Sequence, residues 1–481
     1  MIAIPRIYKQ LSSLGTFARY SLPFILTLAI AIGIFLRLHN LVPVARGLQF
    51  PQDYDEAVWD TTAQLMLQGY LPYRDFFATL PPVGIYLLAG VLRTVAPWGN
   101  TVGFMATRYA SVFYGSVTII AIYFLGRKLT GPLGGLVAAV LLVTDGTVIA
   151  VDRRALLEPP VNLLSVVTML VYVSTFEHSC SDSHSLKTAV LTGFLGAVCT
   201  LTKTPGIVVV MALISVSLLR RRFLEATAIL VSFVVSWLAL SAYFLGRCPE
   251  DFIKQVYFFQ LLRPPDGIIP RASRLYHIWN CTISWLTVRV GLIGVLFRVL
   301  PTISRRKTGP WWLILVWMGY IIALILFTRS YWPQYYAQLA VPLSVLAGGL
   351  FDRQAWQDSV IGRIPSLNIG ILTIMAFLLI GLVSGRIADQ WAGVIHMLEE
   401  TDFTYLEVAK FLSENSQPKS IVLAFEPNYT FLASRQLAGI RPNHLLVDSY
   451  GEMLYVNLGI PEKSLPVLLN AVLNGEKEKL Q

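Results

Sequence analysis

Long apolar segments separated by short polar connections run through most of the chain. Most of them reach the roughly 17–25 residues that an α-helix needs to cross the hydrocarbon core of a bilayer. The candidate spans, about eleven by this length argument, are 22–38, 104–126, 131–150, 160–176, 187–203, 205–219, 223–245, 278–300, 310–328, 333–350 and 366–386. The pattern predicts an all-α polytopic membrane protein.

The apolar segment 82–96 is short for a span, and the charges around it decide its place. Prolines at Pro81 and Pro97 bound it, which favours an interfacial or re-entrant helix. If this segment does not cross, all large basic clusters fall on one side. They are the N-terminus with Arg6, Lys9 and Arg19, then Arg127-Lys128, Arg220-Arg221-Arg222 and Arg298, Arg305, Arg306 and Lys307. The positive-inside rule then predicts a cytoplasmic N-terminus and an extracytoplasmic C-terminus.

This topology divides the chain into two parts. Residues 1–386 form a transmembrane domain with two large outer loops, 39–103 and 246–277. Residues 387–481 are predicted to form a small extracytoplasmic α/β domain. Its expected elements are a helix over Thr404–Asn415, a buried strand over Ser420–Phe425, and a turn leading to a short helix over Pro427–Ser434.

Composition agrees with a membrane protein. The chain is 55% hydrophobic and only 14% charged, whereas soluble domains carry about 25% charged residues. Its net charge is +10, but from Asp389 onward twelve acidic residues outweigh seven basic ones, so this part carries −5 and the rest +15. The basic residues lie between spans rather than on one soluble face, so membrane lipids, and no nucleic acid, are the expected contacts.

The four cysteines, Cys180, Cys199, Cys248 and Cys281, show no spacing typical of a metal site. Cys248 and Cys281 both face outside in the predicted topology, which permits a disulfide between them. Isolated cysteines in membrane proteins also serve as small apolar residues. Both interpretations stay open.

Carboxylates gather just after the first span, at the outer boundary, as Asp53, Asp55 and Glu56. Charges at such a depth are costly to hold, so they predict a functional site, here one with a base. Asp152 and Glu158 follow the third span on the same side. They form either local ion pairs or a second acidic element across a cavity. Paired carboxylates serve as base and orienting group, or hold a divalent cation through oxygen ligands.

Basic residues at the outer face break the positive-inside pattern. They are Arg108, Arg153, Arg154, Lys203, Arg247, Arg263, Arg271, Arg274 and Arg329. Some would snorkel to lipid headgroups. Others, converging over a cavity, would bind a lipid phosphate, since arginine matches phosphate oxygens bidentately. Tyr335 lies in an aromatic run that fits either an interface belt or a sugar-stacking surface.

The chain resembles the GT-C superfamily of glycosyltransferases that use polyprenyl-phosphate-linked sugars. Within it, the chain is similar to the protein mannosyltransferase and aminoarabinose transferase branch, and to bacterial Rgt-type lipopolysaccharide transferases. The residues that carry the resemblance are Asp55-Glu56, GYLPYRDFFATLPP from Gly69 to Pro82, Ala106-Thr107-Arg108, Arg154 to Glu158, and Leu201-Thr202-Lys203. The topology agrees over residues 20–350, and the C-terminal residues match no motif of the family.

The resemblance implies a GT-C transmembrane domain over residues 1–386 and a role for each matching residue. Asp55 would be the catalytic base, or orient the acceptor, and Glu56 would support it. Arg108, Arg154 and Lys203 would face the lipid phosphate, and Glu158 would line the cavity. Asp152, Arg263 and Tyr335 join the predicted substrate site by their outer position. Many relatives have His-Tyr where this chain has Pro333-Gln334-Tyr335-Tyr336, so no donor contact is carried over there.

The implied reaction is transfer with inversion, in which an acceptor hydroxyl attacks the anomeric carbon. It needs a base and positive charge at the departing phosphate. The acceptor would be a cell-envelope lipid, glycan or protein, and a bacterial inner membrane with an outward site is expected. No cofactor is required, and a divalent cation stays open.

A membrane transporter or lipid flippase is the alternative function. Such proteins carry charges along a path near mid-bilayer, often in paired halves, whereas here the charges gather at one face. An oligosaccharide ligase or polymerase would share the transferase architecture.

Overall fold

The computed structural model describes residues 22–41, 52–174, 182–265, 269–305, 311–351, 366–399, 404–418, 420–424, 427–439 and 444–474. Several sequence predictions therefore lie outside the described residues: the basic positions Arg6, Lys9, Arg19, Arg306 and Lys307, and Cys180.

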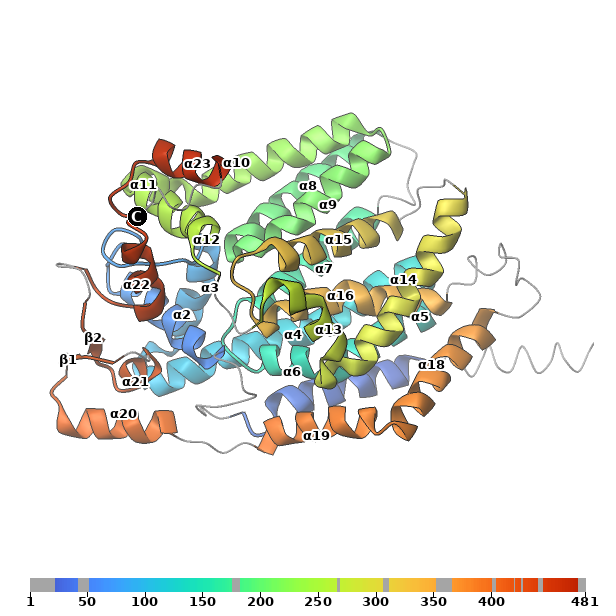
Figure 1. Ribbon diagram of the computed structural model, residues 1–481, viewed down its shortest axis with the longest axis horizontal. Helices are drawn as coiled ribbons and strands as arrows, with labels where there is room; N and C mark the ends of the chain where they lie inside the picture. Colours follow the sequence, from blue (N-terminus) through green and yellow to red (C-terminus); the bar gives the residue numbers. More distant parts are fainter. Residues whose placement is uncertain are drawn as a thin grey trace, which may run out of the picture.

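A bundle of helices makes up most of the molecule (Figure 1), and a helix lies at each predicted span. These helices are Leu22–Leu38, α4 (Asn100–Thr130), α5 (Pro132–Thr144) with α6 (Gly146–Asp152), α7 (Glu158–Ser174), α8 (Asp182–Thr202), α9 (Ile207–Leu219), α10 (Phe223–Arg247), α14 (Trp285–Arg305), α15 (Trp311–Phe327), α16 (Tyr336–Gly348) and α18 (Ser366–Val383). The predicted all-α fold is confirmed.

Length and hydropathy alone single out few of these helices as complete spans. In the described part of the chain, two helices, α4 and α10, are long and apolar enough to cross a membrane. The number rises to five if each sharply bent helix pair counts as one span; α5 and α6, for example, meet at 67°. The other apolar helices have 10–17 residues.

Small residues let the helices of the bundle approach closely. A side-chain carbon on Gly126 of α4 would lie 2.9 Å from the Cα of Gly135 on α5. One on Gly294 of α14 would lie 2.2 Å from the carbonyl oxygen of Leu346 on α16. In a bilayer, apolar side chains gain little by leaving lipid, so helices associate through close packing. Glycines at helix crossings permit such close backbone contact, which is typical of helix packing in membranes.

Short elements from the outer loops cover one end of the bundle. They are α2 (Gln52–Leu67), α3 (Pro82–Val95), η1 (Ala96–Trp98), η2 (Thr204–Gly206), α11 (Pro249–Ile253), the π-helical turn η3 (Lys254–Phe258), α12 (Phe259–Leu262), η4 (Arg271–Ser273), α13 (Arg274–Asn280), η5 (Thr282–Ser284) and η6 (Pro333–Tyr335). The turn η7 (Gly349–Phe351) instead follows the far end of α16 and packs on α5 and α18. The apolar segment bounded by Pro81 and Pro97 forms a helix, α3, as expected, and packs on α2, α4 and α8.

The C-terminal segment, residues 386–474 as described, continues over the same end. Its elements are α19 (Arg386–Glu399), α20 (Thr404–Asn415), β1 (Ile421–Val422), α21 (Pro427–Leu432), β2 (Gln436–Leu437), α22 (Ser449–Asn457) and α23 (Leu465–Asn474). The helix predicted over Thr404–Asn415 is present. A strand, β1, lies within the predicted range Ser420–Phe425, but it has two residues and pairs with β2. The predicted burial is wrong for the described residues, since Ile421 is 69% and Leu423 90% exposed.

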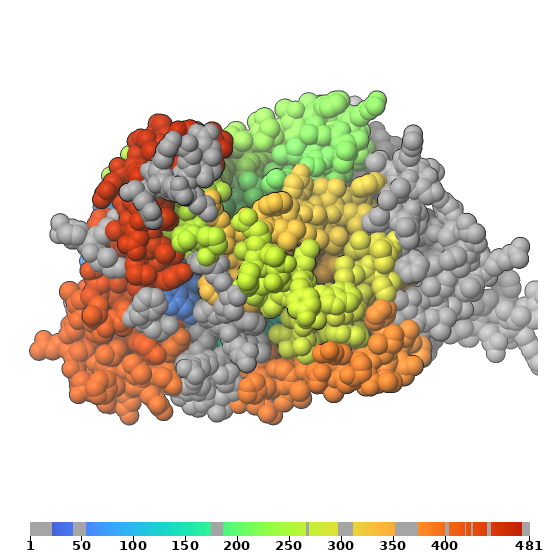
Figure 2. Space-filling model, viewed as in Figure 1, coloured from blue at the N-terminus to red at the C-terminus, as the bar shows by residue number. Residues whose placement is uncertain are grey.

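Buried side chains that follow α19 in the C-terminal segment share hydrophobic clusters with the predicted outer loops, whereas those of α19 pack on the first helix and α6. Phe431 and Val447 join the cluster of Ala57 on α2. Tyr455 joins the cluster of Phe77, with the two ring centroids 4.9 Å apart. Figure 2 shows the C-terminal residues, in red and orange, against residues of the second outer loop. The segment therefore packs as a wall on the outer loops.

A buried ion pair fastens α2 to the bundle. The Nε and Nη2 atoms of Arg108 on α4 donate to the two carboxylate oxygens of Glu56, at 2.8 and 2.7 Å. The backbone N–H of Ala155 adds a third hydrogen bond to Glu56, at 2.8 Å. Both charged side chains are almost completely buried. Removing two charges from water is costly, and the cost is offset only when hydrogen bonds as short and as numerous as these satisfy the charged groups.

A second buried pair holds the first helix. The Nε atom of Arg37 donates to Asp152 at 2.8 Å. Gly115 of α4 makes room for the carboxylate, since a side-chain carbon there would lie 2.3 Å from the Asp152 Cγ. The ion pair therefore joins the first helix to α6, and the Asp152 carboxylate packs against α4.

We expect Arg108→Ala to lower the free energy of unfolding by about 3–5 kcal/mol, because it leaves the Glu56 carboxylate buried without its cation. The measurement is thermal unfolding of the purified protein in detergent. Arg93→Ala, at an exposed arginine of α3, is the matched control and should change little. Equal unfolding temperatures for the two variants would contradict the role given to the pair.

Candidate functional site

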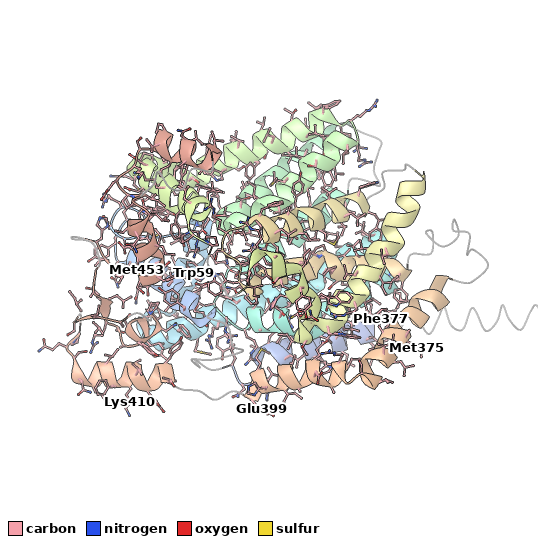
Figure 3. The ribbon with its side chains drawn as sticks, viewed as in Figure 1. Trp59, Met375, Phe377, Glu399, Lys410 and Met453 are labelled. Atoms are coloured by element: carbon pink, nitrogen blue, oxygen red, sulfur yellow. The ribbon has the colours of Figure 1, made fainter. Side chains whose placement is uncertain are left out.

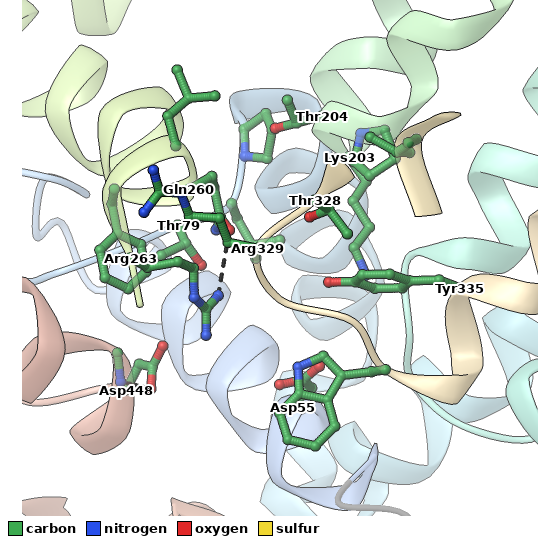
Figure 4. A pocket seen from close by; sticks show the side chains of 18 of the residues that line it. Asp55, Thr79, Lys203, Thr204, Gln260, Arg263, Thr328, Arg329, Tyr335 and Asp448 are labelled. Atoms are coloured by element: carbon green, nitrogen blue, oxygen red, sulfur yellow. Dashed lines mark hydrogen bonds between the residues drawn. The ribbon is translucent and has the colours of Figure 1, made fainter. Parts of the chain in front are cut away.

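A cavity of about 890 Å³ lies between the outer elements and the bundle. Polar side chains from both parts of the chain line it (Figure 4): Tyr54, Asp55, Thr79, Lys203, Thr204, Gln260, Arg263, Thr328, Arg329, Gln334, Tyr335, Asp448 and Tyr450. Trp59 of α2 and Met453 of α22, labelled in Figure 3, mark this end of the molecule. The cavity brings together residues from both outer loops and the C-terminal segment.

Asp55 stands in the first turns of α2 and lines the cavity. It is half-buried, and within the described ranges its carboxylate has no hydrogen bond or ion pair. Burial raises the pKa of Asp55 to about 7; Lys203 and Arg263 oppose the shift, while Glu158 and Asp448 add to it. A carboxylate with this proton affinity is suited to take a proton near neutral pH.

Lys203 faces Asp55 from the end of α8. The helix ends at Thr202, Lys203 has extended backbone angles, and the following turn begins at Thr204. Its Nζ atom lies 2.6 Å from Oε1 of the buried Glu158 at the start of α7. It also lies 5.6 Å from the ring centre of Tyr335. The ammonium group is therefore fixed in the cavity wall.

Two arginines extend the positive charge. Arg263 follows α12, where its guanidinium lies 5.1 Å from the Phe259 ring centre and donates from Nη1 to Gln260 at 3.3 Å, the dashed line of Figure 4. Arg329 follows α15, and its buried Nη1 has no hydrogen-bond partner in the described structure. Lys203, Arg263 and Arg329 form the cation set of the cavity.

The C-terminal segment contributes Asp448, which precedes α22. Its Oδ1 atom accepts hydrogen bonds from the backbone N–H of Gly451 at 2.7 Å and from the Tyr54 hydroxyl at 3.0 Å. Figure 4 shows Asp448 and Asp55 both directed into the cavity. The sequence analysis missed Asp448, because an aspartate before a short helix indicates a helix cap and nothing about a site 393 positions away.

Five predicted site residues do not line the cavity: Glu56, Arg108, Asp152, Arg154 and Glu158. Glu56 and Arg108 form a buried ion pair with each other, and Asp152 forms one with Arg37. Arg154 is buried and donates to the Ala150 carbonyl at 3.3 Å. The resemblance placed Glu56, Arg108 and Arg154 in the site, and the predicted outer position placed Asp152. Neither argument distinguishes charges that face a cavity from charges that join helices.

Of the two interpretations left open for Asp152 and Glu158, the structure shows ion pairs and not a second acidic element. The two side chains bind different cations, Arg37 and Lys203. Within the described ranges, no three His, Cys, Asp or Glu side chains converge in a way that would hold a metal ion. Glu158 instead positions Lys203, while Arg263 and Tyr335 lie in the cavity wall as predicted.

Cys248 and Cys281 are free thiols, so the permitted disulfide is absent between them. The Sγ atom of Cys248 is buried beside the Pro72 carbonyl, 3.7 Å away. That of Cys281 lies 3.6 Å from the Thr147 hydroxyl at the bend between α5 and α6. Each cysteine fills space in a different part of the fold.

Comparison with known proteins agrees with the predicted resemblance. Residues 79–244 match the family described as dolichyl-phosphate-mannose-protein mannosyltransferase. This match spans α3, α4 and the helices up to α10. No curated protein matches the sequence.

Solved structures share the fold. ArnT from Cupriavidus metallidurans, bound to undecaprenyl phosphate, is 14% identical with a TM-score of 0.60, over 90% of this chain and 87% of that one. The oligosaccharyltransferase of Archaeoglobus fulgidus is 12% identical with a TM-score of 0.60, over 90% of this chain and 65% of that one. The chain therefore spans just under two thirds of the archaeal protein's length. The predicted GT-C fold is confirmed, since the chain shares the fold of these two proteins over 90% of its length.

The raised pKa of Asp55 makes stability depend on pH. Between its ordinary pKa of 3.8 and about 7, the folded state holds a proton that the unfolded state has lost, so stability falls as pH rises through this window. Asp55→Asn should therefore stabilise the protein at pH 8 by at most about 4 kcal/mol, since one pKa unit corresponds to about 1.4 kcal/mol. At pH 4 the gain should be small.

Unfolding temperatures at pH 4 and pH 8 test this expectation. Asp389→Asn, at an exposed aspartate of α19, should show no such difference between the two pH values. An Asp55→Asn variant that is less stable than the wild type at pH 8 would count against a buried, proton-binding carboxylate.

Proposed function

We propose that this protein is an inverting glycosyltransferase with Asp55 as its base. It would move a sugar from a polyprenyl-phosphate-linked donor to a hydroxyl of a cell-envelope lipid, glycan or protein at the extracytoplasmic face of a membrane. The observation that carries the proposal is one cavity that joins an unpaired carboxylate of raised pKa to a set of three cations. The family match over residues 79–244 supports the donor class.

The chemistry would follow from these charges. The acceptor hydroxyl gives its proton to a carboxylate oxygen of Asp55 while its oxygen bonds to the anomeric carbon. The bond from that carbon to the phosphate oxygen breaks on the opposite side, and the phosphate leaves with the electron pair. Lys203, Arg263 and Arg329 would stabilise the negative charge that develops on the departing phosphate.

The apolar part of the cavity wall suits a lipid-linked donor. Ile207 of α9 and Leu324 and Phe327 of α15 line it, and Phe327 is 75% exposed on the outside of the bundle. A polyprenyl chain could leave the cavity across this surface and remain among bilayer lipids, while its phosphate meets the cations. A soluble nucleotide-sugar would gain nothing from such a wall.

The predicted orientation supports the proposed location. Arg127 and Lys128, in the last turn of α4, and Arg220 to Arg222, between α9 and α10, lie away from the cavity, which by the positive-inside rule supports a site outside the cytoplasm. We propose a bacterial inner membrane as its setting, with residues 387–481 as an extracytoplasmic unit beside the site.

We expect Asp55→Asn to lower sugar transfer by about 100-fold or more, because it keeps the shape of the side chain and removes the base. The assay uses a panel of short-chain polyprenyl-phosphate sugars with the purified protein in detergent. For the wild type, kcat/KM should rise with pH through about 7, as Asp55 loses its proton. Equal rates for variant and wild type would remove Asp55 from the mechanism. Absent turnover of every donor, with movement of labelled lipid across liposomes, would favour a flippase.

A double variant, Lys203→Met with Glu158→Gln, tests the role proposed for Lys203 at the departing phosphate. Removing both charges avoids leaving a buried carboxylate alone, so the fold should survive. Transfer should fall by roughly 100-fold, the cost of losing one group that stabilises transition-state charge. Glu158→Gln alone should lose far less, because Lys203 keeps its charge. A double variant with wild-type kcat would exclude Lys203 from phosphate binding.

A further inference from the structure

The hydroxyl of Tyr54 joins the helix of Asp55 to the C-terminal segment. It lies 3.0 Å from Oδ1 of Asp448 and 3.0 Å from Oγ of Ser449, and it accepts a hydrogen bond from the backbone N–H of Tyr450 at 3.0 Å. These partners form the first turn of α22, whose N–H groups have no partners within the helix. A side chain of α2 therefore helps to cap a helix almost 400 positions later in the sequence.

Three consecutive residues of α2 thus point in three directions. Tyr54 binds α22, Asp55 faces the cavity, and Glu56 binds Arg108 of α4. The Tyr54 ring is largely buried, and α2 packs on α21 of the same C-terminal segment. The carboxylate of Asp55 makes no hydrogen bond among the described residues, so its position depends on the two neighbours that do.

We propose that Asp448 is a positioning residue of the transfer reaction: through the Tyr54 hydroxyl it fixes the first turn of α2 and holds Asp55 toward the cavity. This inference rests on the proposed function. It assigns the C-terminal segment, which carries no motif of the resembling family, a part in the reaction. We call the contact of Tyr54 with Asp448, Ser449 and Tyr450 the latch.

The charge of Asp448 adds a second consequence. Lys203, Glu158, Asp448 and Arg263 act on the proton affinity of Asp55, and Tyr335 interacts with it. The other titratable or charged groups that line the cavity are Tyr54, on its own helix, Arg329 and Tyr450. Glu158 and Asp448 are the two carboxylates that raise the pKa of Asp55, and of these two Asp448 accepts the hydrogen bond from Tyr54. Neutralising it should make Asp55 more acidic, whereas breaking the latch at Tyr54 should not.

The test therefore compares Tyr54→Phe with Asp448→Asn. Both should lower kcat by roughly 10-fold or more, because small displacements of a catalytic group are costly, and both should leave the KM for the donor within about 2-fold. Only Asp448→Asn should move the acid limb of the pH profile to lower pH. Tyr70→Phe and Asp389→Asn, at exposed positions, are the matched controls and should behave as the wild type.

A second readout does not need turnover. Hydrogen exchange of the peptide covering residues 445–458 should be faster in Tyr54→Phe, because the Tyr450 N–H loses its acceptor. Exchange equal to that of the wild type would overturn the latch. So would a wild-type kcat in both variants, or an acid limb that Asp448→Asn does not move. Absent turnover by the wild type with every donor would instead overturn the proposed function, and the exchange result would still decide whether the latch exists.

Discussion

The site depends on the buried ion pair between Glu56 and Arg108. Two charges are removed from water there, and three short hydrogen bonds to the Glu56 carboxylate offset the cost. Geometry of this kind tolerates little movement, so it fixes the angle at which α2 crosses the end of the bundle. Asp55 follows from that angle: on a helix, the residue beside a buried one must face elsewhere, and here it faces the cavity.

Some charged groups that line the cavity lack a partner in the described structure, which lowers the stability of the fold but leaves these groups available to a substrate. Lys203 has its partner, Glu158, but Asp55 has none among the described residues, and Arg329 keeps a buried nitrogen without a hydrogen bond. Such unpaired groups lower the stability of the folded chain, and they are common where a substrate supplies the missing partner. In the proposed reaction, the phosphate of the donor and the hydroxyl of the acceptor would supply the missing partners.

Much of the fold could be predicted from the sequence, and less of the site. Helices follow the apolar runs because a chain in lipid must satisfy its backbone internally. Asp55 and Lys203 could be found from polar residues at the outer boundary. Depth alone did not reveal that Glu56 and Arg108 bind each other, and no local pattern joined Tyr54 to Asp448, since that contact depends on how distant segments pack. The burial of β1 was mispredicted because its two-residue length was not visible in the apolar run.

The contact between Tyr54 and α22 also has a consequence for the order in which the cavity is assembled during synthesis of the chain. Residues 54 and 448 are separated by 394 positions, and ribosomes add roughly 5–20 residues per second. The first outer loop is therefore made about 20–80 seconds before the segment that closes its cavity. The nascent chain therefore carries Asp55 well before Asp448 is made, and the cavity is complete only after the C-terminal segment has been synthesised.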